Sequence, residues 1–115
     1  MSANAKGPSA GIRVEDFVPP PDGQSVRVEG GRRAVAVFRV GGKLFAIDAK
    51  CPHAGGPLER GTLTATSVVC PWHGSEFDLE SGVVQRGPAR TGVRAFAARM
   101  EGSALVLEER EGRGG

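Results

Sequence analysis

The sequence has little of what several common classes of protein need. It has no tyrosine, one tryptophan and only 5% aromatic residues overall. It contains no run of 18 apolar residues, and residues 1–8 lack the apolar core of a signal peptide, so we expect a soluble, cytoplasmic protein without membrane contact. Fifteen basic and thirteen acidic residues leave a net charge of +2 with no long basic run, so no nucleic-acid partner is expected.

Cofactor motifs are also scarce. No Gly-x-Gly-x-x-Gly fingerprint follows a predicted strand, which leaves nicotinamide and flavin binding without support. At 115 residues the chain has the length of one small domain and no room for a second catalytic unit. We expect this domain to occupy residues 12–110, between a flexible N-terminus at 1–11 and a flexible tail at 111–115.

Glycine and proline, by contrast, are abundant, with 18 and 8 residues. Short strand-like segments alternate with these turn residues, and no segment shows a sustained helical period, which predicts an all-β fold, a small antiparallel sandwich or barrel. Gly41 and Gly42 predict a hairpin turn that places Phe38 opposite Phe45. The strands are predicted at 12–17, 25–28, 33–40, 43–48, 67–69, 76–79, 83–84, 93–100 and 104–109, with the last hairpin turning at 101–102.

Every cysteine and histidine of the chain lies in two short clusters. One residue separates Cys51 from His53, 16 residues separate His53 from Cys70, and two residues separate Cys70 from His73. Structural zinc sites usually separate paired ligands by about two to four residues, which Cys51 and His53 do not. A [2Fe-2S] cluster with two thiolates on one iron and two imidazoles on the other needs this set of ligands. The spacing favours the mixed-ligand cluster, and a zinc site is the alternative.

The residues around these ligands resemble the two cluster-binding loops of the Rieske family. They read CPHAGGPL from Cys51 and CPWHGSEFD from Cys70. The resemblance implies one Rieske-type [2Fe-2S] cluster, with Cys51 and Cys70 on the inner iron. It also implies that His53 and His73 bind the outer iron near the protein surface, and that this iron accepts the electron.

Several neighbouring residues are expected to tune this cluster. Gly55 and Gly74 can adopt unusual backbone angles and let peptide N–H groups approach the sulfurs. By the resemblance, the hydroxyl of Ser75 reaches a bridging sulfide, and Pro88 belongs to a loop that covers the cluster. Trp72 either shields the cluster, faces a partner, or only packs at the base of its loop.

Three departures indicate which members of the family the chain resembles. Respiratory Rieske proteins carry an extra disulfide at the positions of Gly56 and Trp72, and a tyrosine at Phe77. These differences make the chain similar to the soluble Rieske ferredoxins of bacterial ring-hydroxylating oxygenases. Arg90 replaces a second proline of the covering loop. We expect a midpoint potential in the lower half of the family range of about −150 to +300 mV.

A terminal Rieske oxygenase needs a further iron site built from histidines, and His53 and His73 are already used. We therefore expect an electron carrier and not an enzyme, which takes electrons from a flavin-dependent ferredoxin reductase and passes them to a terminal oxygenase of a dioxygenase system. One alternative is the small subunit of an assimilatory nitrite reductase, whose partner is the large subunit. Another is a zinc-stabilised interaction module. Glu76, Asp78 and Glu80 form either an acidic docking rim or a solvated strand face.

Overall fold

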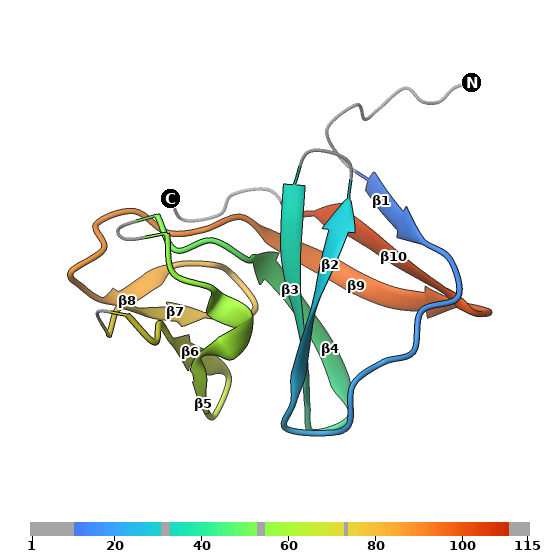
Figure 1. The fold of residues 1–115 in the computed structure, drawn as a ribbon, viewed down its shortest axis with the longest axis horizontal. Helices are drawn as coiled ribbons and strands as arrows, with labels where there is room; N and C mark the ends of the chain where they lie inside the picture. The colour runs from blue at the N-terminus through green and yellow to red at the C-terminus, as the bar shows by residue number, and fades with distance from the viewer. Residues whose placement is uncertain (1–10, 31–32, 53–54, 73, 111–115) are drawn as a thin grey trace.

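The computed structural model describes residues 11–30, 33–52, 55–72 and 74–110, and its strands form two antiparallel sheets (Figure 1). The larger sheet has the order β1 (Gly11–Val14), β10 (Ala104–Glu109), β9 (Ala95–Glu101), β4 (Lys43–Asp48), β3 (Arg33–Val40) and β2 (Ser25–Gly30). The smaller sheet has the order β5 (Thr62–Thr64), β6 (Ser67–Val69), β7 (Glu76–Asp78) and β8 (Val84–Arg86). A short 3-10 turn, η2 (Leu58–Arg60), precedes β5. The predicted all-β, antiparallel class is confirmed.

The hairpin between β3 and β4 forms as the sequence predicts. Gly41 and Gly42 have φ angles of 61° and 82°, which the favoured two-residue hairpin turn requires at both central positions. Phe38 lies opposite Phe45 in the ladder. The Gly42 N–H donates to the Asp22 carboxylate at 2.7 Å, which ties the turn to the preceding loop.

Side chains of the central strands alternate between two apolar cores, because successive residues of a strand point to opposite faces. One core joins Phe38 of β3 to Phe77 of the smaller sheet and to both cysteines. The other core joins Val37 to residues of β9 and β10, with Phe96 among them. Burial of each of these three phenylalanines contributes about 1.5–3 kcal/mol to folding. The cysteine loops therefore lie on a packed apolar base.

The strand ends differ from the sequence prediction in several places. β1 ends at Val14, since Asp16 turns the chain with a φ of 53°, and Gly11 belongs to β1 and not to the flexible N-terminus. β5, which has three residues, was not predicted. The last hairpin turns at Gly102 and Ser103, since β9 continues through Glu101. The segments predicted at 76–79, 83–84 and 93–100 are strands at Glu76–Asp78, Val84–Arg86 and Ala95–Glu101.

Helical structure in the described ranges amounts to short turns. None of the helices found there is long and apolar enough to cross a membrane.

Candidate metal centre

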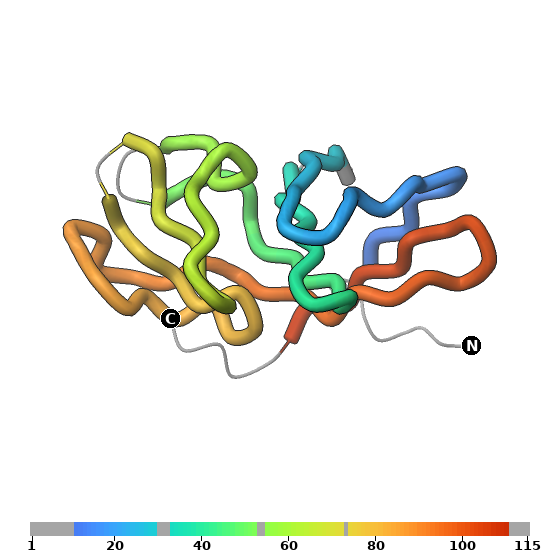
Figure 2. Tube along the Cα trace, turned by 90° about the horizontal axis from the view of Figure 1, so that it is seen from below, coloured from blue at the N-terminus to red at the C-terminus, as the bar shows by residue number. Residues whose placement is uncertain are grey.

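The two cysteines begin two loops at the end of the molecule formed by the smaller sheet. Cys51 follows β4 and Cys70 follows β6, and Figures 1 and 2 both place the coloured parts of the two loops at this end. Both side chains are reduced thiols and are almost completely buried, at 1% and 2% exposure. The predicted ligands His53 and His73 lie outside the described residues.

The first loop, residues 51–56, is closed by two backbone hydrogen bonds. The Cys51 N–H donates to the Gly56 carbonyl at 3.0 Å, and the Gly55 N–H donates to the Cys51 carbonyl at 2.7 Å. Gly55 has a φ of 75°, where a residue with a β-carbon would cost about 1–2 kcal/mol. The chain thus turns back on itself within six residues.

The second loop, residues 70–75, repeats both bonds at the same positions. The Cys70 N–H donates to the Ser75 carbonyl at 2.7 Å, and the Gly74 N–H donates to the Cys70 carbonyl at 3.1 Å. Gly74 has a φ of 83°. The unusual backbone predicted for these glycines is confirmed, while hydrogen bonds from peptide groups to the sulfurs stay a prediction.

These equal bonds align the two loops without a gap, as CPHAGG and CPWHGS. In this alignment His53 is the third residue of its loop and His73 the fourth of its loop. The two loops therefore have the same backbone hydrogen bonds, and their ligand spacings differ only because the histidine stands one position later in the second loop.

The loops pack against each other at Gly56. A β-carbon at this residue would lie 2.8 Å from the Cys70 Sγ and 3.1 Å from the Trp72 Cγ. The indole ring of Trp72 therefore lies close against Gly56, at the two positions where the sequence resemblance places the extra disulfide of respiratory Rieske proteins. Trp72 as a whole is nevertheless 57% exposed. Packing and exposure thus occur together in this residue.

Ser75 connects the second loop to the segment after β8. Its side chain is completely buried, and its Oγ accepts the Ala89 N–H at 2.8 Å. A hydroxyl that accepts one hydrogen bond can still donate its own hydrogen, so Ser75 can donate toward a sulfide. Pro88 is exposed, and Ala89 makes this contact instead. Sequence reasoning missed Ala89, although its place next to Pro88 was a signal.

The strand that leads into the first loop ends in a titratable group that sequence reasoning also missed. The Asp48 carboxylate accepts the Arg94 N–H at 3.0 Å. Burial raises the pKa of Asp48 from 3.8 to about 6, with Arg33 opposing the increase and Glu109 adding to it. The charged form of this carboxyl is therefore unfavourable in the folded protein.

The carboxylates that form either an acidic docking rim or a solvated strand face are largely engaged in local contacts. Glu76 accepts the Thr64 hydroxyl at 3.1 Å and forms an ion pair with Arg86 at 3.4 Å. Asp78 accepts the N–H groups of Glu80, at 3.2 Å, and of the next residue, at 2.8 Å. These carboxylates stabilise the strand and turn that carry them, which argues against the docking rim.

The described residues fit one half of a mixed-ligand iron–sulfur cluster. Two buried thiols belong to the same apolar core, and a glycine without a β-carbon leaves room beside the Cys70 sulfur. Thiolates are the ligands that iron–sulfur clusters use. The described residues do not include His53 or His73, and among them no group of three or more His, Cys, Asp or Glu side chains could hold a metal ion.

Comparisons with known proteins agree with this chemistry. The model of the Rieske [2Fe-2S] domain matches residues 12–97. The chain is 31% identical over 86 residues to the ferredoxin component of biphenyl 2,3-dioxygenase of Rhodococcus jostii, covering 75% of this chain and 80% of that one. It is 35% identical over 86 residues to apoptosis-inducing factor 3 of Mus musculus, and this alignment covers 75% of the present chain. The chain spans only 14% of the length of that relative.

A similar solved structure is that of a complex of reduced oxygenase and oxidized ferredoxin in carbazole 1,9a-dioxygenase. The match has a TM-score of 0.76 and 25% sequence identity. It covers 84% of this chain and 93% of the other.

Proposed function

Since the chain belongs to the Rieske [2Fe-2S] domain family, we propose that it is a one-electron carrier that connects a flavin-dependent ferredoxin reductase to a terminal oxygenase. The observation that carries the proposal is the pair of equally bonded loops, each starting with a buried cysteine. Such a pair presents two thiolates from two directions to one cofactor. The likeness to a ferredoxin in complex with an oxygenase supports the choice of acceptor.

Four residues would hold the cluster in this proposal. Cys51 and Cys70 supply thiolates to one iron, and His53 and His73 supply imidazoles to the other. The bound cluster takes up and releases one electron. The apolar core around both cysteines keeps water away from their sulfurs, and the loop hydrogen bonds hold the backbone in place for binding.

The same ligand count makes the chain a carrier and not a catalyst. The sequence has two histidines, and the cluster uses both, so none is left for a mononuclear iron site. The similarity to the ferredoxin component of a biphenyl dioxygenase agrees with this role. The proposal includes a cytoplasmic location, because thiols stay reduced there and remain available as ligands.

The test measures electron uptake and electron delivery. Reductive titration should show one electron per two irons, with a midpoint potential in the lower half of about −150 to +300 mV. After rapid mixing with the terminal component of the Rhodococcus jostii biphenyl dioxygenase, the reduced protein should be reoxidised faster than after mixing with buffer alone. A colourless protein without iron, or a reduced protein that no oxygenase component reoxidises, would contradict the proposal.

A further inference from the structure

Two hollows are both lined by Pro52, the exposed residue that follows Cys51. The first, of about 450 Å³, has Lys50 and Asp48 on its wall. The second, of about 500 Å³, lies between Pro52 and the segment with Pro88 and Arg90. Pro52, next to the candidate ligand Cys51, therefore borders both depressions.

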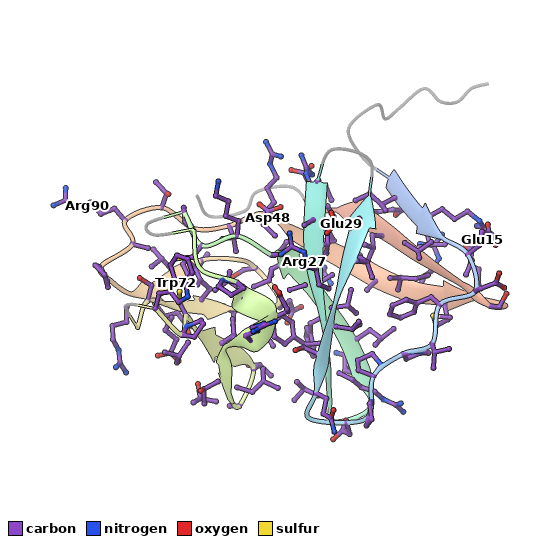
Figure 3. All side chains as sticks on the ribbon, viewed as in Figure 1. Glu15, Arg27, Glu29, Asp48, Trp72 and Arg90 are labelled. Carbon is purple, nitrogen blue, oxygen red and sulfur yellow. The ribbon has the colours of Figure 1, made fainter. Side chains whose placement is uncertain are left out.

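Each hollow has one exposed cation without an ion-pair partner among the described residues. These cations are Lys50 in the first hollow and Arg90 in the second. Figure 3 shows Arg90 projecting from the end of the molecule on which Trp72 also lies. The two side chains present positive charge around the first loop.

The carboxylates that line the first hollow, Asp48 and Glu29, cancel little of that charge. Asp48 accepts the Arg94 N–H, and its raised pKa keeps it partly protonated near pH 6. Glu29, in the same hollow as Lys50, is paired with Arg27 at 2.9 Å. Glu76, on the smaller sheet, is paired with Arg86.

We propose that the electron-transfer partner has an acidic face and docks on Pro52, with one carboxylate near Lys50 and another near Arg90. This inference rests on the proposed function. Trp72 and Pro88 add exposed apolar surface beside the cations. Complementary charge accelerates association, and exposed aromatic side chains supply contact area, so a small and short-lived interface suffices.

Small charged oxidants test the charge at the electron exit without the natural partner. Reduced protein is mixed with ferricyanide, an anion, and with tris(phenanthroline)cobalt(III), a cation, at increasing ionic strength. The rate with ferricyanide should fall as salt is added, and the rate with the cobalt complex should rise or stay constant, because salt screens an attraction only for the anion. The opposite pair of salt dependences would overturn the inference.

Charge reversal locates the effect. Lys50→Glu and Arg90→Glu should each lower the low-salt rates with ferricyanide and with the oxygenase component about tenfold, and high salt should remove the difference. Lys43→Glu is the matched control, since Lys43 begins the strand that ends just before Lys50, about 23 Å away at 3.3 Å per residue. The control should change both rates by less than about twofold.

The outcomes separate this inference from the proposed function. Visible spectra and midpoint potentials of each variant are measured first, and unchanged values show that the cluster is intact. If the wild type transfers electrons and the Lys50→Glu and Arg90→Glu variants do so at the same rate, the docking site is overturned and the carrier function stands. Faster transfer by the glutamate variants shows a basic partner and also overturns it. An absence of transfer by the wild type overturns both.

Discussion

The two cysteine loops share their backbone hydrogen bonds but differ in their sixth residue. In the first loop this residue is Gly56, against which the Cys70 sulfur and the Trp72 ring pack. In the second loop it is Ser75, whose hydroxyl accepts the Ala89 N–H. The sixth residue of the first loop is held by close packing, and that of the second loop by a buried side-chain hydrogen bond, although the backbone hydrogen bonds are the same in both.

This difference shows that the turn and the environment of the cluster are set separately. Backbone bonds and a glycine with positive φ produce the turn in each loop. The sixth residue then decides what lies beside the sulfurs. Close packing at Gly56 allows no added atom, whereas the hydroxyl of Ser75 would change the electrostatic potential at a bound cluster.

The largest effect is expected from adding one carbon to the first loop. Gly56→Ala should prevent cluster binding, because its β-carbon would lie 2.8 Å from the Cys70 Sγ and 3.2 Å from the Trp72 Cδ2. Iron analysis and visible absorbance measure the loss. The control is Gly11→Ala, whose β-carbon would meet nothing closer than 3.9 Å. Full iron content in Gly56→Ala would show that close packing of the second loop against residue 56 is not needed for cluster binding.

The second loop should respond through the potential. Ser75→Ala removes a hydroxyl that can donate to sulfur, so we expect the midpoint potential to fall by about 60 mV, equal to about 1.4 kcal/mol for one electron. It also leaves the buried Ala89 N–H without its acceptor, at a cost of about 1–3 kcal/mol.

Protein-film voltammetry and urea unfolding measure the two effects of Ser75→Ala. Ser67→Ala is the control, since Ser67 is also buried but bonds to the side chain of Gln85 on the smaller sheet. It should lower stability and leave the potential unchanged. An unchanged potential in Ser75→Ala would mean that this hydroxyl has no electronic role.

The shared turn predicts equal effects at the fifth position. Gly55→Ala and Gly74→Ala should each lower the free energy of unfolding by about 1–2 kcal/mol, because both residues have positive φ. Among the described residues, space does not add to the cost, since the nearest atom to a β-carbon at Gly55 is 3.5 Å away and none lies within 4 Å of one at Gly74. Urea unfolding of both variants checks this, and costs that differ by more than twofold would contradict the equivalence.

The smallest effect is expected at the strand leading into the first loop. The pKa of Asp48 rises from 3.8 to about 6 on folding, so the folded state binds this proton more tightly than the unfolded chain. The resulting stability is complete below about pH 3.8 and is lost as the pH rises through 6. Asp48→Asn keeps an acceptor for the Arg94 N–H and removes the buried charge.

Above pH 6 we expect the free energy of unfolding of Asp48→Asn to exceed that of the wild type. The difference should be only about 1 kcal/mol, because solvent screens this half-exposed group. The difference between the two proteins should shrink between pH 6 and 4. Thermal unfolding of both at several pH values measures it. A difference that stays constant with pH would assign the effect to something other than this charge.

Local patterns predicted the parts of the molecule that depend on neighbours in the sequence. The hairpin of Gly41 and Gly42, the Phe38 and Phe45 pair, and the positive φ of the loop glycines all follow from short segments. The contact of Gly56 with the second loop joins segments 14 or more residues apart, and so does the bond from Ala89 to Ser75. Their partners depend on how two sheets pack, which no local pattern contains.

The raised pKa of Asp48 has the same origin. Its sequence neighbours indicate only the end of a strand, whereas the cause is burial, with Glu109 adding to the rise and Arg33 opposing it, both from other strands. The engagement of Glu76 by Arg86 also needed the paired strands of the smaller sheet. Charge at a site could therefore not be predicted from the segment that carries it.

The ligand set can be tested directly because His53 and His73 are the only histidines. Protein labelled with ¹⁵N at histidine alone is reduced, and pulsed electron paramagnetic resonance measures the nitrogens coupled to the electron spin. Two coupled ¹⁵N nuclei are predicted, with one lost in His53→Ala or His73→Ala or the whole signal lost with the cluster. A reduced protein with no paramagnetic centre, or a centre with no ¹⁵N coupling, would contradict the mixed-ligand cluster.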